Sequence, residues 1–303
     1  MSQVAPAAAG AVGFYGKIPA QRDFIRINAG AFLRAGLDRW LQEGVEHLQG
    51  LQLPAETTCF LLSPAAGTQS FVGALAPGTD SLGRAFPVVI FAAVDQPSHA
   101  GCSLLPLRLA SFCAASVRLA RTAHALDLAQ LVAEIDALAS GPRLAVRVPD
   151  VNALLARSSG SDLGAAVGGL PGAAAYALFT LIAACSHTKA PDSPARVLVL
   201  DCPAPSDELR TFWLALVRRH LPEQMPSFFW TRESGRLLIA LGPAPSLMLA
   251  YLADSEHKGS RRWPLRTLDP SARAKALEKL SPAQRRVLSN GDASLADVLQ
   301  VFA

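Results

Sequence analysis

The side chains most able to do chemistry lie in two short polar stretches near the amino terminus. An opening loop carries Lys17, Arg22, Asp23 and Arg26, and a later Gly-Arg turn carries Arg84. A lysine that follows a glycine can contact a phosphate, but a phosphate-binding loop needs several successive backbone amides before the lysine, and the spacing here lacks them. These charges therefore indicate protein contacts rather than nucleotide binding.

Local groupings typical of catalysis are missing from the sequence. The six histidines stand in unrelated contexts without the H-E-x-x-H spacing of zinc peptidases, and no G-x-S-x-G motif occurs. We therefore expect a protein that is not an enzyme and that uses no cofactor, no metal and no small-molecule substrate. A hydrolase with dispersed catalytic residues is the alternative, because triad members often lie far apart in sequence.

The five charged residues support two interpretations. They form a partner-binding surface on exposed loops, or Asp23 pairs with Arg84 and so holds two turns together. A half-buried ion pair between neighbouring loops is a common way to fix loop geometry. We favour the pair for Asp23 and Arg84, and we expect any partner surface to include it together with exposed Lys17 and Arg22.

The motifs around these charges resemble those of a known family. Residues 13–26 read GFYGKIPAQRDFIR, residues 80–89 read DSLGRAFPVV, and residues 227–231 read SFFWT before an apolar run. They are similar to the Gly-Lys-x-Pro and Asp-Phe steps, the Gly-Arg-x-Phe-Pro element and the later aromatic hairpin of the TagF family of type VI secretion-associated proteins. The resemblance spans about residues 13–254.

This resemblance implies a non-enzymatic regulator that represses a type VI secretion system after translation. It implies a partner, the cytoplasmic forkhead-associated scaffold protein of that system, which the regulator would occupy so that the apparatus cannot assemble. The interface is then expected to use Lys17, Arg22, Asp23, Arg26 and Arg84.

Composition predicts a large core and a cytoplasmic location. Half of the 303 residues are hydrophobic and 17% are charged, which argues against disorder. No Lys or Arg precedes Lys17, so the start lacks the basic region of a secretory signal. The five cysteines form no C-x-x-C pair, as expected for buried thiols in a reducing compartment.

Residues 163–185 carry no charge, but Pro171 and Gly172 interrupt them and leave no continuous span of the roughly 20 residues that a bilayer requires. We expect a glycine-rich connector over residues 160–169, then a buried helix, and no membrane insertion.

The positive charge is concentrated at the carboxyl end. Residues 255–303 hold nine Lys/Arg and five Asp/Glu, so this segment carries the entire net charge of +4. Lys258, Arg261, Arg262 and Arg266 surround Trp263. We interpret this cluster as a solvated basic linker, because nucleic-acid binding normally needs a broader basic stripe. A polyanion-binding accessory module is the remaining alternative.

The elements that must position these residues indicate an α+β fold, a central, mostly antiparallel sheet flanked by helices. Short apolar runs separated by turn residues predict a meander over residues 57–62, 69–76 and 87–94, and a helix with one apolar face is expected from Asn28 past Trp40. We expect a body over residues 1–254, either as one unit or as two lobes of 11–140 and 141–254, and a small basic helical extension over residues 255–303.

Overall fold

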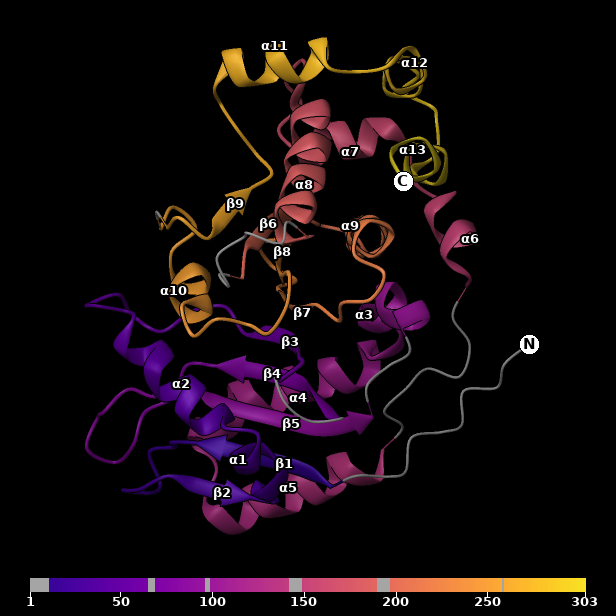
Figure 1. Ribbon diagram of the computed structural model, residues 1–303. Helices are drawn as coiled ribbons and strands as arrows, with labels where there is room; N and C mark the ends of the chain where they lie inside the picture. Colours follow the sequence, from indigo (N-terminus) through magenta and orange to yellow (C-terminus); the bar gives the residue numbers. More distant parts are fainter. Residues whose placement is uncertain (1–10, 65–68, 96–98, 142–148, 190–196, 258) are drawn as a thin grey trace. The chain divides into compact units, whose positions relative to one another are not determined.

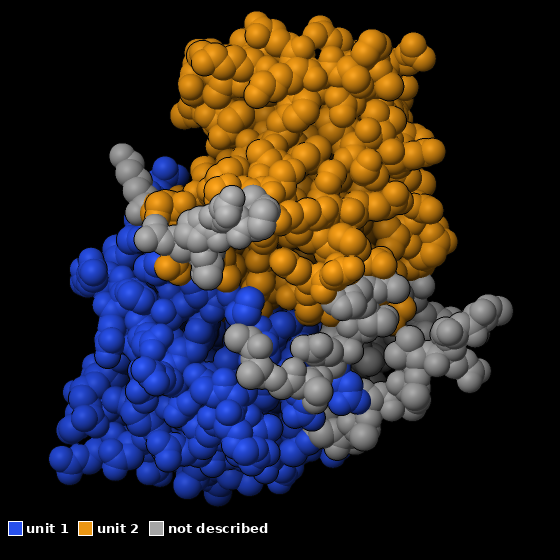
Figure 2. Space-filling view, viewed as in Figure 1, with its two compact units in different colours: residues 1–97, 109–145, 243–257 blue, residues 98–108, 146–242, 258–303 orange. Residues whose placement is uncertain are grey.

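The computed structural model describes residues 11–64, 69–95, 99–141, 149–189, 197–257 and 259–303, and Figure 1 traces its elements. The chain divides into two compact units, each built from separated segments (Figure 2). The first unit contains residues 1–97, 109–145 and 243–257, and the second contains residues 98–108, 146–242 and 258–303. Both units combine mostly antiparallel strands with helices, which confirms the predicted α+β class.

In the first unit the strand order is β2-β1-β5-β4-β3, and each neighbouring pair is antiparallel. The predicted meander is confirmed by the last three strands of this order. The short β2 lies where a loop is expected, because three residues are too few to show the alternation of a strand. The strands are β1 (Val12–Gly16), β2 (Ile25–Ile27), β3 (Thr58–Leu62), β4 (Gln69–Ala76) and β5 (Val88–Asp95).

Gly16 ends β1 in a conformation that favours glycine. Its φ is +147°, and a Cβ at this position would lie 2.5 Å from the carbonyl oxygen of Pro87. A side chain would therefore push β1 away from the residues that lead into β5. This close approach brings the loop after β1 next to the turn before β5.

The helices of the first unit cover its sheet. Helix α4 packs on β4 and β5, and α5 packs on β1 (Figure 1). The single helix predicted from Asn28 is instead two helices, because Gly36 adopts a left-handed φ of +71° between them. The helices are α1 (Gly30–Arg34), α2 (Leu37–Glu46), α4 (Ala110–Thr122), the 3-10 turn η2 (Ala123–Ala125), α5 (Leu128–Ser140) and α10 (Met248–Ala253).

In the second unit the strand order is β7-β8-β6-β9. The predicted hairpin is confirmed as the antiparallel pair β7–β8, while β9 runs parallel to β6. The strands are β6 (Val199–Pro203), β7 (Ser227–Trp230), β8 (Arg236–Ala240) and β9 (Arg262–Pro264).

Residues 160–169 are not only a connector, since a helix occupies most of them. Ser159 and Asp162 form a capping box that fixes the amino end of α7, and Leu163 and Ala166 supply its buried face. These local hydrogen bonds outweigh the poor helix propensity of Gly160 and Gly164. The predicted buried helix that follows is confirmed as α8.

The carboxyl-terminal helices pack within the second unit. Helix α11 packs on α8, and α13 packs on α9, α6 and α7 (Figure 1). The helices of this unit are η1 (His99–Leu104), α3 (Leu105–Arg108), α6 (Val151–Leu155), α7 (Gly160–Ala166), α8 (Ala173–Lys189), α9 (Asp207–His220), α11 (Pro270–Glu278), α12 (Pro282–Ser289) and α13 (Leu295–Phe302).

Among the described residues, no single helix has the length and apolar composition needed to cross a membrane, although one bent helix pair meets that criterion by length and composition only.

Candidate functional site

Asp80, in the turn between β4 and β5, organises the polar residues of the first unit. Its Oδ1 accepts hydrogen bonds from the backbone amides of Leu82 (3.0 Å) and Arg84 (2.9 Å). Its Oδ2 accepts from Lys17 Nζ (2.9 Å) and Arg84 Nε (2.6 Å). The Asp80 side chain is fully shielded from solvent and that of Lys17 is 9% exposed. The carboxylate therefore receives two charged and two backbone donors.

These donors determine the protonation state of Asp80. Burial alone raises the pKa of this carboxyl, but the hydrogen bonds from Lys17 and from Arg84 and Leu82 favour the charged form and together hold the pKa well below its ordinary value of 3.8. Asp80 is therefore ionised throughout the physiological pH range.

Acid is expected to remove the stabilisation that Asp80 provides. Because the pKa is lower in the folded protein than in the unfolded chain, this contribution is fully present above about pH 5 and is lost as the pH falls below 3.8 toward the folded value. We expect the difference in free energy of unfolding between wild type and Asp80→Asn to shrink in urea titrations between about pH 5 and pH 2.5. A difference independent of pH would contradict an ionised Asp80.

The same turn is tied to the loop that follows β1. Arg84 Nη2 donates to the carbonyl oxygen of Arg22 (2.9 Å), and the amide of Ser81 donates to that of Gln21 (3.0 Å). Phe24 lies in this junction, with its ring centroid 4.7 Å from that of Phe86. We call residues 17–24 and 77–86 the braced loops, since ionic, backbone and aromatic contacts all join them.

Two expectations about the predicted site residues are wrong. Lys17 was expected to be exposed, but it is buried against Asp80 and lies 4.9 Å from the centre of the Phe24 ring. Asp23 was expected to pair with Arg84, but Arg84 pairs with Asp80, and Asp23 is exposed with no ion pair among the described residues. Asp80, four residues before Arg84, pairs with the arginine within the same turn, so Arg84 does not need Asp23 as an ion-pair partner.

A sequence signal could have identified Asp80. Aspartate is common at the first position of a β-turn, and glycine is common at the fourth. The side chain of such an aspartate often accepts hydrogen bonds from backbone amides a few residues later in the chain. Asp80 and Gly83 have this spacing, and the amide of Gly83 donates to the Asp80 carbonyl oxygen (2.9 Å).

The outer side of the braced loops is the candidate partner-binding surface. Leu82 is 59% exposed at the tip of the turn, an unusual position for a large apolar side chain. Arg22 and Asp23 are exposed on the neighbouring loop, and the Arg84 side chain is 54% exposed. We define these four residues as the braced-loop surface. Arg26 is also exposed but lies on β2.

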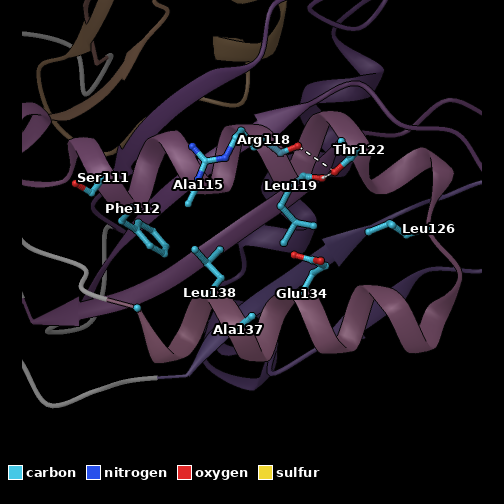
Figure 3. A pocket seen from close by; sticks show the side chains of 11 residues that line it. Ser111, Phe112, Ala115, Arg118, Leu119, Thr122, Leu126, Glu134, Ala137 and Leu138 are labelled. Carbon is cyan, nitrogen blue, oxygen red and sulfur yellow. Dashed lines mark hydrogen bonds between the residues drawn. The ribbon is translucent and has the colours of Figure 1, made fainter.

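A groove of about 400 Å³ separates α4 and α5 in the same unit (Figure 3). Its walls are partly apolar, with Phe112, Leu119 and Leu138 among the lining residues. Arg118 on α4 and Glu134 on α5 add one charge of each sign. Neither histidine nor cysteine is among the residues that line the groove.

Three of the cysteines are poor nucleophiles, because burial disfavours their thiolate forms. Burial raises the pKa of Cys102 and of Cys185 to about 12, against a smaller lowering effect of nearby Arg218 and Lys189 respectively. Burial also raises the pKa of Cys202 well above its ordinary range. Within the described residues, no cluster of His, Cys, Asp or Glu has a geometry that could hold a metal ion.

In the second unit, the basic stretch around Trp263 is not simply a solvated linker. Arg262 Nη2 lies 2.6 Å from Asp201 Oδ2, and Arg236 Nη2 lies 2.7 Å from the same oxygen. Arg266 donates from Nη2 to the carbonyl oxygen of Ala166 (2.7 Å). Internal contacts thus use two of the four cations in this stretch, while Lys258 lies outside the described residues.

Comparison with known proteins places the braced loops in a recognised domain. Residues 13–138 match the family model of the TagF N-terminal domain, described as type VI secretion system-associated. No protein of curated function matches the chain. A crystal structure of PA0076 from Pseudomonas aeruginosa PAO1 is similar at 18% identity with a TM-score of 0.47, and the similarity covers 82% of this chain and 96% of that one.

Proposed function

We propose that this chain, whose residues 13–138 are a TagF N-terminal domain, represses a type VI secretion system through a protein contact rather than through catalysis. The partner is the forkhead-associated scaffold protein of that system, and the contact takes place in the cytoplasm. Occupation of the scaffold would prevent it from supporting assembly of the apparatus. The domain match supports the association with type VI secretion, and the regulatory role and the partner are our inference.

The observation that carries this proposal is the braced-loop surface. Asp80 accepts hydrogen bonds from Lys17 and Arg84, and backbone hydrogen bonds join the two loops. These contacts hold the surface in one conformation before any partner binds. A surface that is already ordered loses little conformational entropy on binding. Two of its four residues are arginines, which are enriched in binding hot spots, and the exposed Leu82 adds apolar contact area.

The alternatives receive less support from the described residues. The α4–α5 groove is lined by neither histidine nor cysteine, and burial raises the pKa values of the Cys102 and Cys185 thiols. The polyanion-binding alternative relied on the basic carboxyl-terminal stretch, where Arg262 is paired and Arg266 bonds a carbonyl oxygen. Both observations favour a protein partner over hydrolysis or polyanion binding.

Affinity measurement with the purified scaffold tests the proposal. We expect wild-type protein to bind it with a Kd of about 1 μM or tighter, and Leu82→Ser or Arg22→Glu to weaken binding at least about tenfold. Both side chains are exposed, so the variants should keep the wild-type circular dichroism spectrum and unfolding midpoint.

Arg118→Glu, in the α4–α5 groove, is the matched control and should bind like wild type. Absence of binding by folded wild-type protein would refute the partner. Loss of binding in Arg118→Glu alone would move the interface away from the braced loops.

A further inference from the structure

Strand β2 forms one edge of the sheet in the first unit. It pairs with β1 on one side, and no described strand pairs with its other side. The backbone N–H and C=O groups of an edge strand can hydrogen-bond to a further strand, which is how several kinds of domain bind extended peptides. The β2 edge is therefore a place where a strand can be added.

The side chains of β2 are divided between the two faces of the sheet. Arg26 pairs with Tyr15 of β1, whose ring centroid lies 5.6 Å from that of Phe32 in α1. Paired residues project to the same face, so Arg26 lies on the face that α1 covers. Ile25 and Ile27 flank Arg26 and project to the opposite face. Helices α4 and α5 cover that opposite face (Figure 1).

One side of α5 is apolar and exposed beside the β2 edge. Figure 3 shows Glu134 and Leu138 pointing from α5 toward α4. Val132, two positions before Glu134, lies on nearly the opposite side of the helix, and Leu128 lies one turn before Val132 on that side. Because α4 packs on β4 and β5 while α5 packs on β1, the side of α5 away from α4 lies toward β2. Leu128 is 41% exposed and Val132 is 37% exposed.

The charges near this edge differ between the two faces. Arg26 is exposed on the α1 face and forms no ion pair within the described part of the chain. On the α5 face, Asp136 is exposed one turn after Val132. A strand added at the edge would meet a cation on one face, and an apolar surface bordered by an anion on the other. Acidic side chains suit the first face and apolar side chains suit the second.

A second copy of this chain fits the edge poorly. A strand of three residues that pairs fully with its own copy across a two-fold axis places Arg26 directly opposite the other Arg26. Like charges in directly opposite positions destabilise a pair of strands. The charge of the edge therefore favours a segment of a different protein.

We propose that the β2 edge binds an extended segment of a partner protein in which apolar and acidic residues alternate. The segment adds a strand to β2, so that its apolar side chains cover Leu128 and Val132 and its acidic side chains lie near Arg26. Alternation is needed because successive side chains of a strand project to opposite faces. The edge lies outside the braced-loop surface, and this proposal does not depend on the scaffold contact.

Nuclear magnetic resonance titration of the full chain at low ionic strength, with a capped nonapeptide that alternates valine and glutamate, tests the proposal. We expect saturable shifts of the β2 amides and slower hydrogen exchange at those that point away from β1, because strand pairing protects them. The double variant Leu128→Ser with Val132→Ser should weaken binding at least about tenfold, since it removes apolar contact area. Arg26→Glu should weaken it at least about threefold, since it replaces attraction by repulsion.

Two variants and two peptides serve as controls. Leu51→Ser and Arg118→Glu change an exposed leucine and an exposed arginine elsewhere in the first unit and should leave the affinity unchanged. One control peptide has the same composition with its valines grouped together, and the other has lysine in place of glutamate. The proposal is overturned if the alternating acidic peptide does not bind saturably, if either control peptide binds as tightly, or if the chain forms a dimer that Val132→Ser abolishes.

Discussion

Replacement of Asp201 with alanine is expected to lower the free energy of unfolding of the second unit by about 3–5 kcal/mol, the cost of removing one partner from a buried ionic cluster. Arg236 Nε and Nη2 and Arg262 Nε and Nη2 all donate to this carboxylate, at 2.6–2.9 Å. The two arginine side chains are only 14% and 12% exposed. Without the carboxylate, their like charges would face each other in a poorly solvated position.

Denaturant titration followed by tryptophan fluorescence is the suitable measurement, because the buried Trp213 and Trp230 report on this unit. Asp292→Ala is the control, since Asp292 is exposed in the same unit and its replacement should change stability by no more than about 0.5 kcal/mol. A loss below about 1 kcal/mol in Asp201→Ala would show that solvent reaches the cluster more freely than its burial indicates.

Replacement of Asp80 with alanine is expected to lower the midpoint of thermal unfolding by roughly 10 °C. The change leaves the Lys17 ammonium group buried without its carboxylate, and it removes the acceptor for two amides of the turn. The unfolding of the first unit should therefore become easier, and the braced-loop surface should lose its order. Differential scanning calorimetry measures the midpoint directly.

Two variants give this experiment its controls. Asp23→Ala should shift the midpoint by no more than about 2 °C, because Asp23 is exposed. The double variant Lys17→Met with Asp80→Ala should recover part of the loss, since an apolar residue avoids the cost of a buried unpaired charge. If Asp23→Ala were as destabilising as Asp80→Ala, the originally expected pair of Asp23 with Arg84 would be the important one.

The sequence predicted the elements whose cues are local. Alternation and turn residues located β3, β4 and β5. Short or interrupted elements were missed for equally local reasons. β2 and β9 contain three residues each, too few to show a strand pattern. The glycines of α7 are typical of a connector, although a capping box stabilises a helix there.

The candidate site was predicted in part. The sequence correctly drew attention to the loop after β1 and to the Gly-Arg turn, which the structure joins. The sequence did not identify Asp80 as the acceptor that Lys17 and Arg84 share, and it predicted an exposed Lys17 side chain. Charge and spacing cannot distinguish Asp23 from Asp80 as the partner of Arg84, because that choice depends on which carboxylate is buried beside β1 once the strands have paired.

The sequence by itself determined the α+β class and the resemblance of the amino-terminal part to the TagF family, because periodicity, turn chemistry and motifs are carried by neighbouring residues. Only the tertiary structure decided that Lys17 and Asp80, 63 residues apart, form a buried pair, and that Arg236 and Arg262 both pair with Asp201. Contacts at such separations depend on strand register and helix packing. These follow from the burial of the whole apolar core and not from any local pattern.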